Sequence, residues 1–278
     1  MDVDSEKWAA YADAARGPMR WVYRREWRKV AALERRIVAE CDWSLFVSDA
    51  EAAVMARAAP DRADRIVGIS NGVDTGYFDP APGYDAPFDA RHPHFVFTGT
   101  MDYPPNADAV GWFAREILPA IRGTVPDARF HIVGNRPTPS VAALAEIDGV
   151  TVTGRVPDVR PYLAHAVAAV APMRIARGIQ NKVLEARAMG RPTVVTSGAL
   201  EGIDAAPGRH VALADTVDAF AAACAALARD GDRAGLGAAA RALVLSDYAW
   251  DARLSALDPL LDAASGAMAG AQPRQDPA

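Results

Sequence analysis

The sequence predicts an α/β protein: a doubly wound parallel sheet covered by helices, preceded by a smaller, partial unit of the same kind. Two observations carry this prediction. From residue 94 onward, short apolar runs alternate with helical segments, an order that favours right-handed crossovers between parallel strands. Before residue 90 only two apolar runs suit strands, and two strands with three helices leave open sheet edges. We therefore expect a partial domain with its linker at 1–90 and a complete domain at 91–264.

The partial domain is predicted from helical periodicity and one capping pattern. Apolar residues recur at helical spacing after Pro18, which suits a helix start. Ser48 with Glu51 three residues later forms a capping-box pattern. The expected elements are helices at 5–16, 18–40 and 49–58, strands at 43–47 and 65–69, and a proline-rich linker at 79–93.

The complete domain is predicted from its regular alternation of elements. We expect strands at 94–98, 128–133, 150–152, 166–171, 192–195 and 211–213. We expect helices at 106–121, 140–146, 182–189, 217–228, 233–245 and 250–264, and a short one that ends at 164 and is capped by Asp158. A tail at 265–278, rich in Gly, Ala, Pro and Gln, should be disordered.

Composition excludes several classes of protein. The chain has 278 residues, a net charge of −5 and 51% hydrophobic residues, as in ordinary globular proteins. Such mild acidity gives no indication of nucleic-acid binding. No apolar run approaches the roughly 20 residues of a membrane-spanning helix, and the acidic start is unlike a signal peptide. We expect a cytoplasmic protein.

Residue spacing gives no indication of a metal centre or cofactor. Cys41 and Cys224 match no metal or redox motif, which favours buried thiols in a reducing compartment. The five histidines show no ligand spacing with each other or with a cysteine. Walker, GxGxxG and GxSxG motifs are absent from the sequence. We expect neither a metal nor a cofactor.

The predicted helix at 18–40 is strongly basic. From Arg16 to Arg36 the sequence has eight arginines and lysines against two glutamates, together with Trp21 and Trp27. One interpretation is an amphipathic contact with an anionic membrane surface. The other, more common for charge runs, is a packed helix with a solvated arginine face.

The segment 171–196 organises the complete domain, since it has the order strand, polar loop, helix, strand. In an open parallel sheet, the loop that leaves a strand's carboxyl end faces the ligand crevice. The following helix points its free N–H groups at that crevice. We therefore expect an anion there.

Five stretches together resemble the group 1 glycosyltransferases, more narrowly the sugar transferases of exosortase and exopolysaccharide systems. They are ISNGVDTGYF at 69–78, VFTGTMDYPPNA at 96–107, HIVG at 131–134, GRVPDVRPYL at 154–163 and the segment 178–196. The resemblance implies the GT-B architecture, in which two Rossmann-like domains face each other and the second binds the nucleotide-sugar donor. It also implies transfer to a glycan or lipid-linked acceptor with retention and without a metal.

The resemblance implies roles for particular residues. Glu185 matches the glutamate that accepts hydrogen bonds from the donor ribose; the alternative is a surface glutamate favoured by the helix dipole. Arg155 and Val156 lie where the family clamps the base; an ordinary strand-to-helix turn is equally open. The implied donor-binding residues are Gly99, Thr100, Asn135, Arg136, Arg155, Val156, Gly178, Ile179, Gln180, Asn181 and Glu185, and the implied catalytic ones are Arg177, Lys182 and Glu185.

Roles can also be predicted for residues in the loop before the helix at 182–189 and in the turn at Asn135. Asn181 is expected to cap the helix, and Lys182 with Arg177 or Arg174 would supply positive charge. Asn135 and Arg136 face the crevice by topology, or form a plain surface turn before Pro137.

The sequence departs from the family pattern at two places. Many members carry a glutamate eight residues before the one matched by Glu185, where this chain has Arg177. Many also place an arginine and a lysine in the loop that here reads GTMDY at 99–103. Our hypothesis is that Arg177 moves the positive charge to the other side of the phosphates, while Gly99 and Thr100 allow close backbone approach.

The resemblance also implies that part of the acceptor domain is missing before Asp2. Three functions stay open: a glycosyltransferase present as a partial chain, a non-catalytic nucleotide-sugar-binding fragment or partner subunit, and a nucleotide-sugar epimerase. The last would need acid and base carboxylates in the cleft.

We expect Arg177→Ala to weaken the binding of a nucleoside diphosphate about tenfold or more, because a charge-assisted contact is lost. Isothermal titration calorimetry measures this directly. Unchanged affinity would reject the hypothesis.

Overall fold

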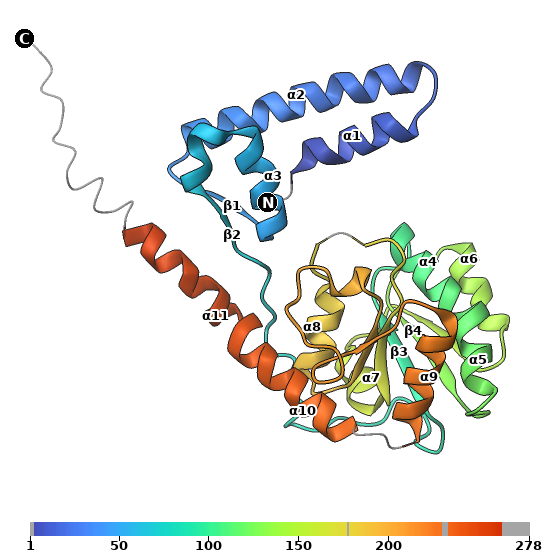
Figure 1. The fold of residues 1–278 in the computed structure, drawn as a ribbon. Coiled ribbons are helices and arrows are strands. Elements are labelled where there is room, and N and C mark those ends of the chain that lie inside the picture. Colours follow the sequence, from blue (N-terminus) through green and yellow to red (C-terminus); the bar gives the residue numbers. More distant parts are fainter. Residues whose placement is uncertain (1–2, 177, 230–232, 263–278) are drawn as a thin grey trace, which may run out of the picture. The chain divides into compact units, whose positions relative to one another are not determined.

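The computed structural model describes residues 3–176, 178–229 and 233–262, which form two compact units (Figure 1). Gly72–Trp250 form the larger unit, and the residues up to Asn71 and from Asp251 form the smaller. The sequence placed the division near residue 90; the structure differs because residues 74–84 are bonded to the larger unit, as shown below. The predicted tail at 265–278 lies outside the described residues.

The larger unit contains a parallel sheet with the strand order β5-β4-β3-β6-β7-β8. The first strand of this sheet in the sequence, β3, is central. The next two strands, β4 and β5, extend the sheet to one edge, and the chain then returns to β6 on the other side of β3. This confirms the predicted doubly wound sheet. Its strands are β3 (His94–Thr98), β4 (Arg129–Val133), β5 (Val150–Gly154), β6 (Ala168–Ala171), β7 (Thr193–Val195) and β8 (Ala212–Leu213).

Helices cover both faces of this sheet (Figure 1). Successive side chains of β3 point to opposite faces of the sheet, so they belong to two separate clusters of the core. Phe95 and Phe97 pack with α4, α5 and α9, whereas Val96 packs with α7 and α8. A π-helical turn, Phe113–Ile117, joins α4 to α5. The helices are α4 (Pro104–Trp112), α5 (Leu118–Arg122), α6 (Pro139–Ala142), α7 (Arg160–His165), α8 (Asn181–Ala188), α9 (Val217–Ala228) and α10 (Arg233–Leu243).

The smaller unit has two parallel strands, β1 (Ser44–Phe46) and β2 (Ile66–Gly68), and three helices before the linker, α1 (Asp4–Ala14), α2 (Pro18–Glu40) and α3 (Asp49–Ala58). A last helix, α11 (Trp250–Leu254), starts at the boundary between the units. Ser48 caps α3 as predicted, since its Oγ accepts the Glu51 N–H at 3.2 Å. In a complete capping box the Glu51 carboxylate would also accept the Ser48 N–H. This part of the prediction is wrong, since the Glu51 carboxylate accepts the Val3 N–H instead, at 2.6 Å.

Two buried histidines connect the central strands to the segment that precedes them. His94 Nε2 lies 2.5 Å from the Asp89 carbonyl oxygen, and His94 Nδ1 lies 2.7 Å from His131 Nε2. Because a carbonyl only accepts, His94 donates through Nε2 and accepts the Nε2–H of His131 at Nδ1. Phe88 stacks on His94 with ring centroids 3.9 Å apart. This arrangement needs a neutral His94, because its Nδ1 accepts and must keep its lone pair.

Burial lowers the pKa of both histidines, and for His131 the nearby His94 and Arg129 add to the effect, so that its pKa is about 4. In the unfolded chain the pKa is about 6.5. The unfolded state therefore binds a proton at His131 at a pH where the folded state does not. Stability that is complete above about pH 6.5 is lost as the pH falls towards 4.

We expect the free energy of unfolding to fall by roughly 2 kcal/mol through His131 between about pH 7.5 and about pH 5. Urea unfolding at the two pH values measures this. The control is His131→Gln, which keeps an N–H donor for His94 and does not titrate, so its loss should be smaller by that amount. Equal losses in both proteins would contradict the neutral pair.

Candidate functional site

A cavity of about 530 Å³ opens at the carboxyl ends of the central strands. It lies beside the place where the chain reverses direction in the sheet, between β3 and β6, which is where open parallel sheets bind ligands. Its walls come from the loops after β3, β4 and β5, from the first turns of α8, and from Phe78. The lining residues are Phe78, Thr98, Gly99, Val133, Gly134, Asn135, Arg155, Val156, Val159, Ile179, Asn181, Lys182 and Glu185.

The structure brings most of the predicted site residues together in this cavity. Those that line it are Gly99, Asn135, Arg155, Val156, Ile179, Asn181, Lys182 and Glu185. Those placed outside the lining are Thr100, Arg136, Gly178 and Gln180. Arg177 lies outside the described residues, so the structure says nothing about its predicted place.

Two glycines let neighbouring strand ends approach closely at the cavity floor. A Cβ on Gly134 would lie 1.7 Å from the Gly99 carbonyl oxygen, so no side chain fits there. The loops are also joined by a hydrogen bond from the Met101 N–H to the Asn135 carbonyl oxygen, at 2.9 Å. The backbone of both loops therefore faces the cavity without a side chain in between.

Lys182 supplies a positive charge inside the cavity. Its Nζ donates to Asn106 Oδ1 at 3.1 Å and to Gln180 Oε1 at 3.3 Å, and it lies 5.1 Å from the centroid of the Phe97 ring. Burial lowers the pKa of Lys182 to about 8, and Glu185 opposes this shift. The ammonium is therefore mostly protonated at pH 7, but a fraction of it is neutral.

Glu185 lies one turn further along α8 and is half-buried. Burial raises the pKa of its carboxyl group, and Lys182 opposes this shift. A carboxylate and an ammonium thus share one wall, and both are partly desolvated. Hydrogen-bond donors and anions of a ligand would each find a partner there.

Three predicted details need correction or qualification. Asn181 does not cap α8: the capping position is Gln180, without a side-chain cap bond, and Asn181 is the first helical residue. Arg174 does not line the cavity, because its Nε donates to Asp108 Oδ2 at 3.0 Å. Arg136 pairs with Asp102 at 2.8 Å, so its charge is partly neutralised.

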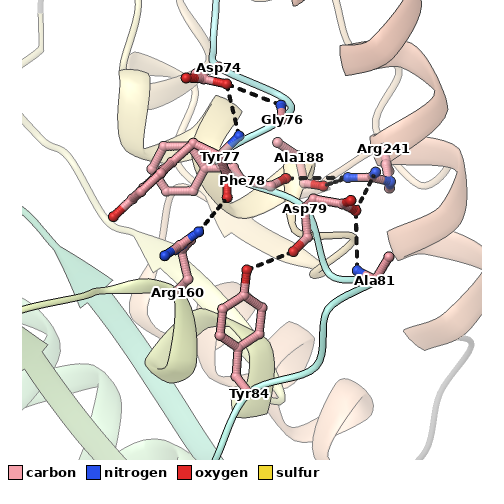
Figure 2. A network of polar contacts seen from close by, with 10 residues as sticks. All are labelled: Asp74, Gly76, Tyr77, Phe78, Asp79, Ala81, Tyr84, Arg160, Ala188 and Arg241. Atoms are coloured by element: carbon pink, nitrogen blue, oxygen red, sulfur yellow. Dashed lines mark hydrogen bonds and ion pairs between the residues drawn. The ribbon is translucent and has the colours of Figure 1, made fainter.

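Phe78 was missed in the sequence because it lies next to residues 79–93, which we interpreted as a linker. Figure 2 shows how the chain just before Phe78 is held. Asp74 accepts the Gly76 and Tyr77 N–H groups, and Arg160 donates to the Tyr77 carbonyl oxygen at 3.0 Å. The Arg160 guanidinium also lies 3.9 Å from the centroid of the Tyr77 ring. Phe78 is thus held as part of the cavity wall.

A second arginine fixes the next residues of the same segment. Arg241 of α10 donates to Asp79 Oδ1 at 2.9 Å, to the Phe78 carbonyl oxygen at 3.3 Å and to the Ala188 carbonyl oxygen (Figure 2). Tyr84 donates its hydroxyl to the Asp79 carbonyl oxygen at 2.8 Å. The segment therefore belongs to the larger unit and not to a free linker.

Asn106 was also missed, although it lies in one of the stretches that carry the resemblance. Its side chain is buried between the loop after β3 and Lys182. The cue was its position at the start of a helix after a glycine-containing loop, which we interpreted only as a helix start.

Other kinds of site find no support in the part of the chain that the structure describes. It holds no group of three or more His, Cys, Asp or Glu side chains placed to bind a metal. No described helix is long and apolar enough to cross a membrane. Glu185 is the sole carboxylate among the described lining residues.

Residues 92–230 match the model of a family described as glycosyl transferases group 1. No curated protein matches the chain. Among solved structures, a glycosyltransferase from Rickettsia africae is similar with a TM-score of 0.66 and 16% identity over 83% of this chain and 64% of its own. Sucrose-phosphate synthase from Thermosynechococcus elongatus is similar with a TM-score of 0.66 and 21% identity over 86% and 62%.

Anabaena HepE in complex with UDP-glucose has a TM-score of 0.66 and 14% identity, over 85% of this chain and 67% of its own. At such identities these likenesses show the fold alone. The chain spans 64% and 62% of the length of the first two structures.

Proposed function

Since the chain belongs to the group 1 glycosyl transferases and has the α/β fold of GT-B enzymes, we propose that its cavity binds a nucleoside diphosphate sugar for transfer to an acceptor hydroxyl. One observation carries the proposal: a carboxylate, an ammonium and the amino end of α8 meet in one cavity at the reversal point of the sheet. A nucleoside diphosphate has a matching diol and matching anionic groups.

The donor is oriented by the chemistry of the walls. Its diphosphate lies near Lys182 and the free N–H groups at the start of α8, which favour negative charge. The Glu185 carboxylate accepts hydrogen bonds from the ribose diol. The base lies against the apolar side chains of Phe78, Val156 and Val159, close to the exposed Arg155. One structural relative, HepE, was crystallised with UDP-glucose, which supports a donor of this class.

The reaction breaks the bond between the anomeric carbon and the diphosphate oxygen and forms one between that carbon and the acceptor oxygen. The diphosphate leaves with the bonding electrons, and its departing oxygen accepts the proton that the acceptor hydroxyl gives up. Lys182 and the α8 dipole stabilise the charge that develops on the leaving oxygen. We propose retention of the anomeric configuration, without a metal or cofactor, which rests on the resemblance to the family.

The acceptor is proposed to be a glycan or a lipid-linked sugar in exopolysaccharide synthesis, again from the resemblance. A second function, donor binding without transfer, is favoured by one observation. Every described residue that lines the cavity belongs to the larger unit, so the binding of a donor does not require the smaller one.

We further propose that the smaller unit contacts an anionic membrane surface through α2. The basic side chains and Trp21 are exposed on this helix, Trp21 to 69%. Arginines attract anionic headgroups, and an indole ring suits the interface between water and lipid. Such a contact would bring the protein to a lipid-linked acceptor at the cytoplasmic face of the membrane.

We expect the protein to sediment with vesicles of phosphatidylglycerol and phosphatidylcholine but not with pure phosphatidylcholine. Replacing Arg24 and Arg28 by glutamate should strongly weaken the sedimentation, because the net charge of residues 16–36 falls from +6 to +2. Replacing Arg57 by glutamate gives the same type of change outside α2 and should have no effect. Equal sedimentation with both kinds of vesicle would contradict an electrostatic contact.

We expect Glu185→Gln to weaken the binding of UDP about tenfold, because the ribose loses a charge-assisted acceptor. The specific readout uses 2′,3′-dideoxy-UDP, which has no diol. The wild-type protein should bind it more weakly than UDP, and this preference should be clearly smaller in Glu185→Gln, whose amide oxygen is a neutral acceptor. Calorimetry that finds the same preference for UDP in both proteins would exclude the ribose role.

A further inference from the structure

Asn106 connects two parts of the cavity through its side-chain amide. It lies in the first turn of α4 and is buried, with 5% of its surface exposed. Its Nδ2 donates to the Thr100 carbonyl oxygen at 2.9 Å, and its Oδ1 accepts from Lys182 Nζ at 3.1 Å. One amide thus joins the loop after β3 to the first turn of α8.

The chemistry of this position suits an amide and not its close relatives. An amide presents a donor and an acceptor at once. A carboxylate in its place could not donate to the Thr100 carbonyl and would add a negative charge beside the ammonium. An apolar side chain of the same size would leave a buried carbonyl and an ammonium without this partner.

We propose that Asn106 is a positioning residue, which holds the Lys182 ammonium at the cavity wall and fixes it to the loop after β3. The inference rests on the proposed function in one respect: the group that the ammonium meets is the donor diphosphate. The position of the ammonium itself does not depend on any ligand. The two statements can therefore be tested separately.

The groups around the Lys182 ammonium determine how a substitution at Asn106 should shift the pKa of that lysine. Glu185 is the charged group that acts on Lys182 among the described residues, and Gln180 and the Phe97 ring complete its surroundings. Since burial lowers the pKa of Lys182, the Asn106 oxygen is one of few groups that stabilise the charged form. Its removal should lower the pKa further, and a carboxylate there should raise it.

The helix offers a matched control. Asp108, two residues further along α4, binds the side chain of Arg174, which lies in the loop between β6 and α8. Asp108→Asn therefore weakens another contact that α4 makes with a neighbouring loop, without touching Lys182. If Asn106 acted only by stabilising α4 and the loops around it, the two changes would have the same consequences.

The first experiment uses the ligand-free protein. The rate at which acetic anhydride acylates Lys182 is followed against pH by peptide mass spectrometry, which gives the pKa of that lysine. Asn106→Asp should raise the pKa by about one unit and Asn106→Leu should lower it by a similar amount, while Asp108→Asn leaves it unchanged. Thermal unfolding by circular dichroism identifies any variant that does not fold. A pKa that is the same in wild type and in the folded Asn106→Asp variant would overturn the proposal.

The second experiment adds UDP. Calorimetry between about pH 7 and about pH 9 should show the wild-type affinity falling as Lys182 loses its proton, with the midpoint of this fall moved to higher pH in Asn106→Asp. Asn106→Leu should bind UDP about tenfold more weakly at neutral pH. If the lysine pKa values move as expected but no form binds UDP, the proposed function fails and the positioning role stands. If UDP binds with the same pH midpoint in wild type and Asn106→Asp, the positioning role is overturned.

Discussion

The close approach of Gly99 and Gly134 is the constraint on which the cavity depends. A Cβ on Gly134 would overlap the Gly99 carbonyl oxygen, so the carboxyl ends of β3 and β4 can lie together only without side chains. Asn106 can contact the loop after β3 because Gly99 has no side chain: a Cβ on Gly99 would lie 2.8 Å from Asn106 Nδ2. Gly134, by lacking a side chain, thus leaves room for Gly99, Gly99 leaves room for Asn106, and Asn106 in turn accepts the hydrogen bond from Lys182.

The two charged groups of α8 are mutually dependent. Burial shifts each towards its neutral form, and each stabilises the charged form of the other. A dianionic ligand beside Lys182 would raise the pKa of the ammonium, and by linkage its binding would take up a proton near neutral pH. The same ligand would repel the Glu185 carboxylate unless hydrogen-bond donors lie between them. Ribose hydroxyls provide such donors, which is why a nucleotide suits this wall better than inorganic phosphate.

The sequence predicted what depends on local pattern. The strand at His94–Thr98 and the helix at Val217–Ala228 lie at their predicted bounds, because alternation and helical spacing are local properties. Asn181 was assigned wrongly as a cap, since the start of α8 differs by one residue from the pattern. Phe78 and Asn106 could not be placed in the site, because their positions depend on Arg160, Arg241 and Lys182, which are distant in the sequence.

The contacts of Arg160 and Arg241 also decide where the binding unit begins. Both arginines lie far along the chain, yet they bind the backbone of residues 77 and 78 and so close one side of the cavity. A division at residue 90 would remove Phe78 and leave the apolar wall open. Residues 77 and 78 therefore belong to the cavity wall and not to a connection between units. A ligand that packs against Phe78 would thus depend on two arginines that are not themselves among the lining residues.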